Sequence, residues 1–128
     1  MSTIRAAAIQ IAPDLSGASP TVDRMISAIS EAADLGVQLA VFPETFAPYY
    51  PYFSFVEPPV LSGKEHQRLY QEAVEVPGPL VQRLSAAAAA HRMVLVVGVN
   101  ERDGGTLYNA QLIFDADGTL LLKRRKIT

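Results

Sequence analysis

Two charged residues, Glu44 and Lys126, occupy positions that suit acid–base chemistry. Glu44 follows residues 37–42 (VQLAVF), an apolar stretch typical of a strand, and open α/β sheets place ligand sites at the carboxyl ends of their strands. The neighbouring rings of Phe42 and Phe46 would partly desolvate this carboxylate, raise its pKa and suit it to general-base catalysis. The alternative is a helix N-cap or a solvated loop glutamate, and spacing alone does not separate the two.

Lys126 closes a basic run at residues 123–126 (KRRK). Such a run is usually a solvated strand end or a weak anion-binding patch. Side chains alternate along a strand, so residues 124 and 126 should share one face and residues 123 and 125 the other. One of these pairs could therefore face a site, and a meeting of Lys126 with Glu44 in one pocket is a hypothesis at this stage.

A strand–helix–strand unit must position Glu44. Residues 4–11 (IRAAAIQI) form a short apolar run that predicts a strand, and Ser19 followed by Pro20 predicts the N-cap and first turn of a helix that ends near Gly36. Apolar residues recur within this helix at spacings of three and four: Val22, Met25, Ile26, Ile29 and Ala33. With the strand at residues 37–42, this order predicts a right-handed crossover between parallel strands and an α/β fold.

A proline-rich segment, residues 43–59, follows. It holds five prolines and several aromatic side chains, among them Tyr49, Tyr50, Tyr52 and Phe53. Prolines remove backbone donors and fix φ, so we expect a long loop without regular structure, and such loops are usually functional. Aromatic walls suit apolar ligands, although most aromatic residues in such loops simply pack.

The rest of the chain predicts two helices and a meander. Helical patterns cover residues 64–74 and 80–91, and residues 93–99 (MVLVVGV) are apolar on both faces, as expected of a central strand covered on both sides. Turn sequences at 103–105 (DGG) and 115–118 (DADG) lie on either side of a predicted strand at 106–114, and a last strand follows at 120–125. Short turns of this kind predict an antiparallel meander.

Composition narrows the function classes. A formal net charge of -2 provides no basic field for nucleic acid or an anionic membrane, and the absence of cysteine excludes disulfides, thiolate metal sites and a cysteine nucleophile within these residues. With two histidines, a metal cluster is not expected. The start of the chain lacks a signal-peptide pattern, and no apolar run approaches the ~18 residues of a membrane span. We expect a cytoplasmic protein.

Several motifs resemble those of the nitrilase superfamily. Residues 41–46 (VFPETF) resemble its glutamate motif, and residues 123–128 (KRRKIT) resemble its lysine motif. Other segments resemble the nitrilase branch rather than the amidase or carbamoylase branches: residues 48–53, 63–66, 76–79 and 98–102. The resemblance covers nearly the whole chain.

This resemblance implies an αββα sandwich, a homo-oligomer and a Cys-Glu-Lys site that hydrolyses a small-molecule nitrile without a metal or organic cofactor. Glu44 would be the general base, Lys126 would stabilise charge on the intermediate, and Tyr50 would line the substrate pocket. The family's cysteine lies downstream of the lysine motif. Residues 1–128 are therefore expected to form a single incomplete domain, the amino-terminal part of a nitrilase, which needs the downstream part as its partner.

Alternatives remain open at this point. The same half-sandwich could be a non-catalytic structural or interaction module, or part of an amidase-type member of the superfamily. His66 and His91 are expected on helix surfaces or at helix ends, and the polar run 100–102 (NER) suits ion pairing or turn capping as well as a site. Asn109, inside an apolar strand, is expected to be satisfied by neighbouring backbone.

Overall fold

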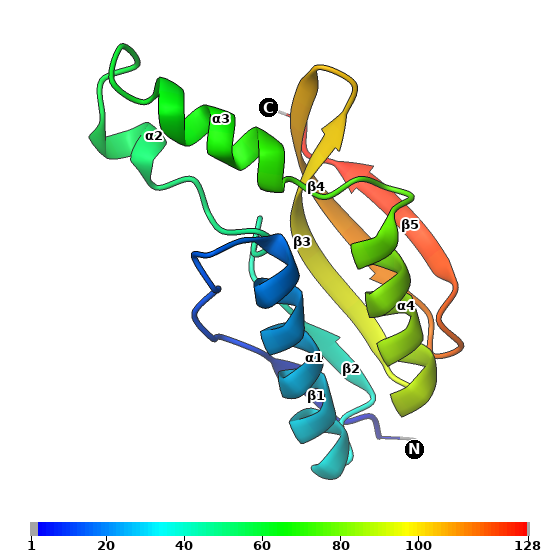
Figure 1. Ribbon diagram of the computed structural model, residues 1–128. Coiled ribbons are helices and arrows are strands. Elements are labelled where there is room, and N and C mark those ends of the chain that lie inside the picture. Colours follow the sequence, from blue (N-terminus) through cyan, green and yellow to red (C-terminus); the bar gives the residue numbers. More distant parts are fainter. Residues whose placement is uncertain (1–2, 128) are drawn as a thin grey trace.

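The computed structural model describes residues 3–127, arranged as one mixed sheet with helices (Figure 1). Met1, Ser2 and Thr128, the last residue of the lysine motif, lie outside the described residues. Within the described part the strand order follows the chain, and the strands are β1 (Ala6–Ala8), β2 (Leu39–Val41), β3 (Val94–Asp103), β4 (Thr106–Phe114) and β5 (Leu120–Arg125). β1, β2 and β3 are parallel, whereas β3, β4 and β5 are antiparallel. The predicted crossover, meander and α/β class are confirmed.

Two helices, α1 (Ala18–Asp34) and α4 (Pro79–His91), cover the same face of the sheet (Figure 1). Their apolar stripes pack against the side chains that point from β3 and β4 to that face. Fully buried side chains of this core include Val22, Met25, Ile29, Leu84, Leu95, Val97 and Leu112. Each such burial contributes roughly 1.5–3 kcal/mol, and the small side chains of α4, such as Ala88, allow close packing on the sheet.

The opposite face of the sheet, here called the open face, has no helix or second sheet over it among residues 3–127 (Figure 1). On β3, Leu95, Val97 and Val99 point to the helices and are buried, whereas Val94 and Val96 point the other way and are only half-buried. Within residues 3–127 the expected cover on both sides of this strand is therefore present on the helix side only. The described chain contains one helical layer and one sheet, two of the four layers of an αββα sandwich.

The start of α1 differs from the prediction for a long-range reason. The N-cap is Gly17 rather than Ser19, and the helix begins at Ala18. The carboxylate of Glu72 accepts a hydrogen bond of 2.9 Å from the Ala18 backbone N–H, which satisfies a donor that a local cap would otherwise bind. Ser19 instead accepts a hydrogen bond from Arg83 of α4.

The proline-rich segment was expected to lack regular structure, but it contains a short helix, α2 (Phe53–Val56), and leads into α3 (Gly63–Glu72). Pro51 sets φ just before this single turn, and Pro58 cannot continue it. The ring of Phe53 packs edge-on against His66 with centroids 4.8 Å apart. α2 and α3 extend away from the sheet (Figure 1). No helix within residues 3–127 is long and apolar enough to cross a bilayer.

Candidate active site

Glu44 stands on an arch that rises from the sheet beside β3. The backbone N–H of Phe42 donates to Val96 at 2.8 Å, and the N–H of Ala47 donates to Gly98 at 3.2 Å. Residues 43–46 lie between these two anchors and cannot follow the ladder, because four residues replace the one that regular pairing would place there. The arch (residues 43–46) thus carries Glu44 at the carboxyl end of β2, as the sequence predicted.

Gly98 lets the arch approach β3 closely. A Cβ atom at Gly98 would lie 2.3 Å from the carbonyl oxygen of Pro43 and 2.8 Å from the Cα of Glu44. Thr45 adopts a φ of 44°, a left-handed conformation that completes the tight turn. This role of Gly98 was not predicted from the sequence, although a glycine within an apolar strand is a known signal of close backbone approach.

The structure brings Glu44 and Lys126 together across 82 residues of sequence. Lys126 Nζ donates to Glu44 Oε1 at 2.7 Å, and Asn109 Nδ2 donates to the same oxygen at 2.7 Å. The predicted alternation of the basic run is confirmed, since Lys123 and Arg125 point to the other face, where both bind Glu101. Asn109 was expected to pair with backbone, and it pairs with Glu44 because β4 places it beside the arch.

The charge state of Glu44 differs from the expectation. Hydrogen bonds from Lys126 and Asn109 hold the pKa of the Glu44 carboxyl below its ordinary value of 4.5. The predicted rise through desolvation was wrong because 44% of the Glu44 side chain stays exposed, so burial opposes the two donors only weakly. In return, Glu44 raises the pKa of Lys126. At neutral pH the pair is therefore a carboxylate and an ammonium, and the carboxylate is free to accept a proton.

Glu44 lies between two pockets. The first, of about 290 Å³, is lined on the open face by Glu44, Gly98, Asn109, Arg124 and Lys126, among others. The second, of about 450 Å³, lies between the loop at residues 10–15 and the aromatic side chains of Phe46, Tyr49, Tyr50 and Tyr52. Tyr50 thus shares a pocket with Glu44. Its ring stacks on Phe55 with an interplanar angle of 11° and centroids 6.2 Å apart.

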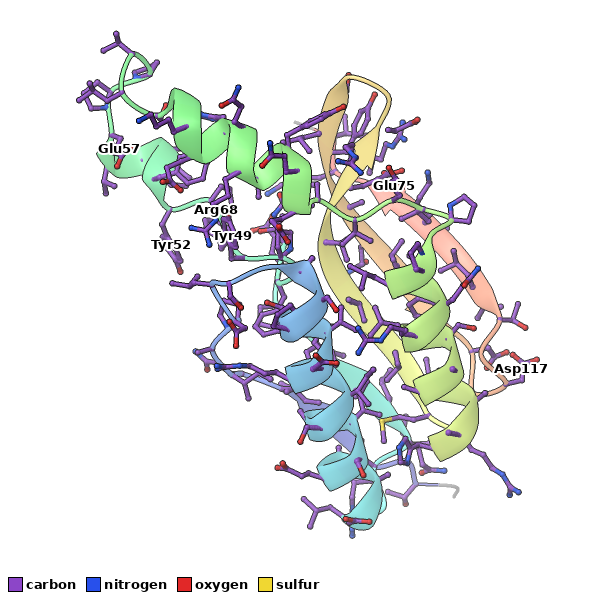
Figure 2. The ribbon with its side chains drawn as sticks, viewed as in Figure 1. Tyr49, Tyr52, Glu57, Arg68, Glu75 and Asp117 are labelled. Atoms are coloured by element: carbon purple, nitrogen blue, oxygen red, sulfur yellow. The ribbon has the colours of Figure 1, made fainter. Side chains whose placement is uncertain are left out.

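The second pocket, here called the aromatic pocket, has Tyr49 in its wall, and this residue contacts α3. Figure 2 shows Tyr49 beside Arg68 of α3 and Tyr52 on the segment that enters α2. The guanidinium of Arg68 lies 5.9 Å from the centroid of the Tyr49 ring. Asn100 Nδ2 donates to the Tyr49 carbonyl at 2.9 Å and so fastens this segment to β3.

The other polar residues considered from sequence lie away from the pair. His66 is on α3 and His91 ends α4. Glu101 forms an ion pair with Arg125 on the helix-facing side of the sheet, and Arg102 forms one with Glu75 at the rim of the sheet. Both agree with the ion-pairing alternative. Within residues 3–127 no group of three or more His, Cys, Asp or Glu side chains is placed to hold a metal ion.

Known proteins resemble this chain over nearly all of its length. The model of the family described as carbon-nitrogen hydrolase matches residues 5–128. A nitrilase from Paraburkholderia phymatum is 65% identical, with 98% of this chain and 37% of that protein covered, and an aliphatic nitrilase from Rhodococcus rhodochrous is 44% identical, with 98% and 35% covered. The chain therefore spans little more than a third of the length of these curated relatives.

Solved structures share the fold. A member of branch 10 of the nitrilase superfamily from Saccharomyces cerevisiae superposes with a TM-score of 0.70 at 24% identity, with 98% of this chain and 44% of that chain covered. An amidase from Nesterenkonia sp. superposes with a TM-score of 0.69 at 19% identity, with 98% and 43% covered. At these identities the likeness extends to the fold, which is that of the corresponding part of both proteins.

Proposed function

Because this chain belongs to the carbon-nitrogen hydrolase family of the nitrilase superfamily, we propose that it is the amino-terminal part of a nitrilase, which converts a nitrile to a carboxylic acid and ammonia. The observation that carries the proposal is the hydrogen bond of 2.7 Å between Lys126 Nζ and Glu44 Oε1. It joins the two motifs that resemble the glutamate and lysine motifs of the superfamily. The 65% identity to a protein named nitrilase supports the nitrilase branch.

The chemistry needs a nucleophile that residues 1–128 do not contain, since they include no cysteine. We place this cysteine in the downstream part of the complete protein. Glu44 accepts the thiol proton while sulfur attacks the nitrile carbon, and that proton passes to the nitrogen to give a thioimidate. One water then releases ammonia and leaves a thioester, and a second water hydrolyses the thioester to the acid and restores the thiol.

Lys126 has a separate task in this scheme. Attack on the nitrile or thioester carbon develops negative charge on nitrogen or oxygen, and a fixed ammonium stabilises that charge. The pairing with Glu44 keeps Lys126 protonated, because it raises the pKa of the amine. The carboxylate and ammonium are thus both in the state that the reaction requires at neutral pH.

Tyr50 is proposed to contact the substrate. It lines the aromatic pocket that also includes Glu44, and the apolar walls of that pocket suit the organic group of a nitrile. In the complete protein, residues 1–128 would form part of one domain, and the downstream part would supply the cysteine. We further propose that the complete protein is a homo-oligomer.

The test is ammonia release by the complete protein from aliphatic and aromatic nitriles, with the matching amides assayed in parallel. Glu44→Gln keeps the shape and removes the base, and Lys126→Ala removes the cation. Each should lower kcat by roughly 100-fold or more.

Matched controls are Glu57→Gln and Lys64→Ala, since both side chains are exposed and lie outside the two pockets. They should leave kcat unchanged. The 128-residue chain by itself should release no ammonia, because it has no thiol for Glu44 to deprotonate. Normal turnover in either site variant would remove that residue from the mechanism, and hydrolysis of amides alone would assign the protein to an amidase-type activity.

A further inference from the structure

Asn109 is the one residue in the described chain that hydrogen-bonds to both members of the charged pair. Its side-chain Nδ2 donates to Glu44 Oε1 at 2.7 Å. Its backbone carbonyl accepts a hydrogen bond of 2.8 Å from the Lys126 N–H. With the Lys126–Glu44 contact, these bonds close a ring of three residues, which come from the arch, from β4 and from the position directly after β5.

The pairing of β4 with both β3 and β5 fixes the position of Asn109. Asn109 of β4 pairs in register with Asn100 of β3, so the two amide side chains point to the same face. Asn100 is buried, and its side-chain Nδ2 donates a hydrogen bond of 2.9 Å to the backbone carbonyl of Tyr49. An antiparallel ladder on both sides leaves β4 little freedom, and Asn109 therefore approaches Glu44 from a rigid support.

The two carboxylate oxygens of Glu44 differ in their hydrogen-bond partners. Lys126 Nζ and Asn109 Nδ2 both bind Oε1, and no hydrogen bond to Oε2 is present among residues 3–127. A lysine on a flexible stem acts as a point charge and does not by itself fix the plane of a carboxylate. The second donor, from a rigid strand, fixes this plane and leaves Oε2 with its lone pairs available.

We infer that Asn109 is a positioning residue for the general base, which holds Glu44 so that Oε2 faces the thiol proton. This inference rests on the proposed function, because it assigns Asn109 a role in the proton transfer from the downstream cysteine. In this role Asn109 acts through Glu44, to which its side chain donates, rather than on the reacting atoms. The amide is neutral, so its hydrogen bond persists at every pH at which Glu44 is ionised.

The experiment compares Asn109→Leu with the wild-type complete protein. Leucine has the same number and branching of side-chain heavy atoms as asparagine and removes the donor. We expect kcat to fall on the order of 10- to 100-fold with little change in KM, since the base is misplaced and the substrate pocket is intact. Loss of a hydrogen bond to the charged form also raises the pKa of Glu44, so the acid limb of the kcat profile should move up by about one pH unit.

A second variant and a control complete the design. Asn109→Ser is smaller and still polar but too short to reach Glu44, and it should give the same shift if Asn109→Leu does not fold. Gln82→Leu makes the same kind of amide-to-leucine change on an exposed position of α4 and should leave the profile unchanged.

The outcomes separate the two proposals. An acid limb that stays in place in the Asn109 variants, with or without a loss of rate, would overturn the positioning role while the Glu44→Gln result upholds the proposed function. If the wild-type protein hydrolyses no nitrile, or if Glu44→Gln is fully active, the proposed function itself fails, whatever the Asn109 variants do.

Discussion

Glu101 is a charged side chain only 1% exposed, on the helix-facing side of β3. Its carboxylate accepts hydrogen bonds from Lys123 Nζ at 2.5 Å and from Arg125 Nε at 2.8 Å. The guanidinium carbon of Arg125 also lies 3.6 Å from the centroid of the Tyr108 ring. A buried charge costs several kcal/mol unless it is paired, so these donors make the burial tolerable. They also fasten the end of β5, one residue before Lys126.

We predict that Glu101 makes stability depend on pH in the acid range. Arg125 and Lys123 hold the pKa of Glu101 below its ordinary value of 4.5. A depressed pKa contributes stability that is complete above the unfolded-state value and is lost as pH falls through the folded-state value. The free energy of unfolding, measured with urea from pH 7 to pH 3, should therefore decline below about pH 4.5.

The variant Glu101→Gln isolates this contribution. It should be destabilised by about 3 kcal/mol at pH 7, because two cations lose their buried partner, and its decline in acid should be shallower than that of the wild type. Glu57→Gln, at an exposed position, should retain the wild-type slope. An unchanged acid slope in Glu101→Gln would show that Glu101 does not titrate differently in the folded and unfolded states.

At the scale of elements, the site depends on the fit between the arch and β3. Neither Glu44 nor Lys126 lies within a named strand, yet strand-like backbone hydrogen bonds hold both. The bonds from Phe42 to Val96 and from Ala47 to Gly98 flank Glu44, and Lys126 itself donates to the Asn109 carbonyl. The arch can leave the ladder only because Gly98 presents no side chain below it. The geometry of the pair is thus set by backbone packing as much as by charge.

We predict that Gly98→Ala displaces the arch. The added Cβ would lie 2.3 Å from the Pro43 oxygen and 2.6 Å from the Thr45 nitrogen, and both are backbone atoms that cannot rotate away. Overpacking of this kind costs about 1–3 kcal/mol, measured by urea unfolding, and the displacement of Glu44 should lower kcat on the order of 100-fold.

Gly105→Ala provides the matched control for this prediction, because a Cβ at Gly105 meets nothing within 4 Å. Its stability should stay within about 0.5 kcal/mol of the wild type. If the two alanine variants were equally stable and equally active, the close contact between the arch and Gly98 would have no part in holding Glu44.

For the whole molecule, the open face is the feature with the widest consequence. The register places Val41, Val96, Ile113 and Leu122 in one row across four strands on that face. Leu122 is 45% and Val41 37% exposed. Contiguous apolar surface of this kind marks an interaction site or an aggregation liability in soluble proteins.

We predict that the isolated 128-residue chain associates through the open face, and that adding the downstream part of the protein prevents this by covering it. Light scattering should give a mass above that of a monomer for the lone chain. Leu122→Gln should shift the chain toward the monomer, whereas Leu35→Gln, at an exposed position at the end of α1 on the helical side, should not. A monodisperse, cooperatively unfolding monomer would contradict the prediction and favour an independent interaction module.

Local patterns in the sequence were enough to predict most of the elements. The 3.6-residue period of α1, the apolar runs of β2 and β3 and the turn at residues 103–105 each depend on neighbours within a few positions, so the α/β order could be derived from them. The strand period also assigned residues 124 and 126 to one face. The boundaries were less accurate: β3 runs to Asp103, beyond the predicted end at residue 99, because its polar end is held by pairing with β4.

Only the tertiary structure decided how the site is assembled. Glu72 at the start of α1, Asn109 on Glu44 and the fit of Gly98 under the arch are contacts between residues far apart in the chain, and no local pattern encodes them. The pKa of Glu44 illustrates the reason. Its sequence neighbours are apolar and suggest a raised pKa, whereas the side chain meets two donors brought from β4 and the end of β5, and these lower the pKa.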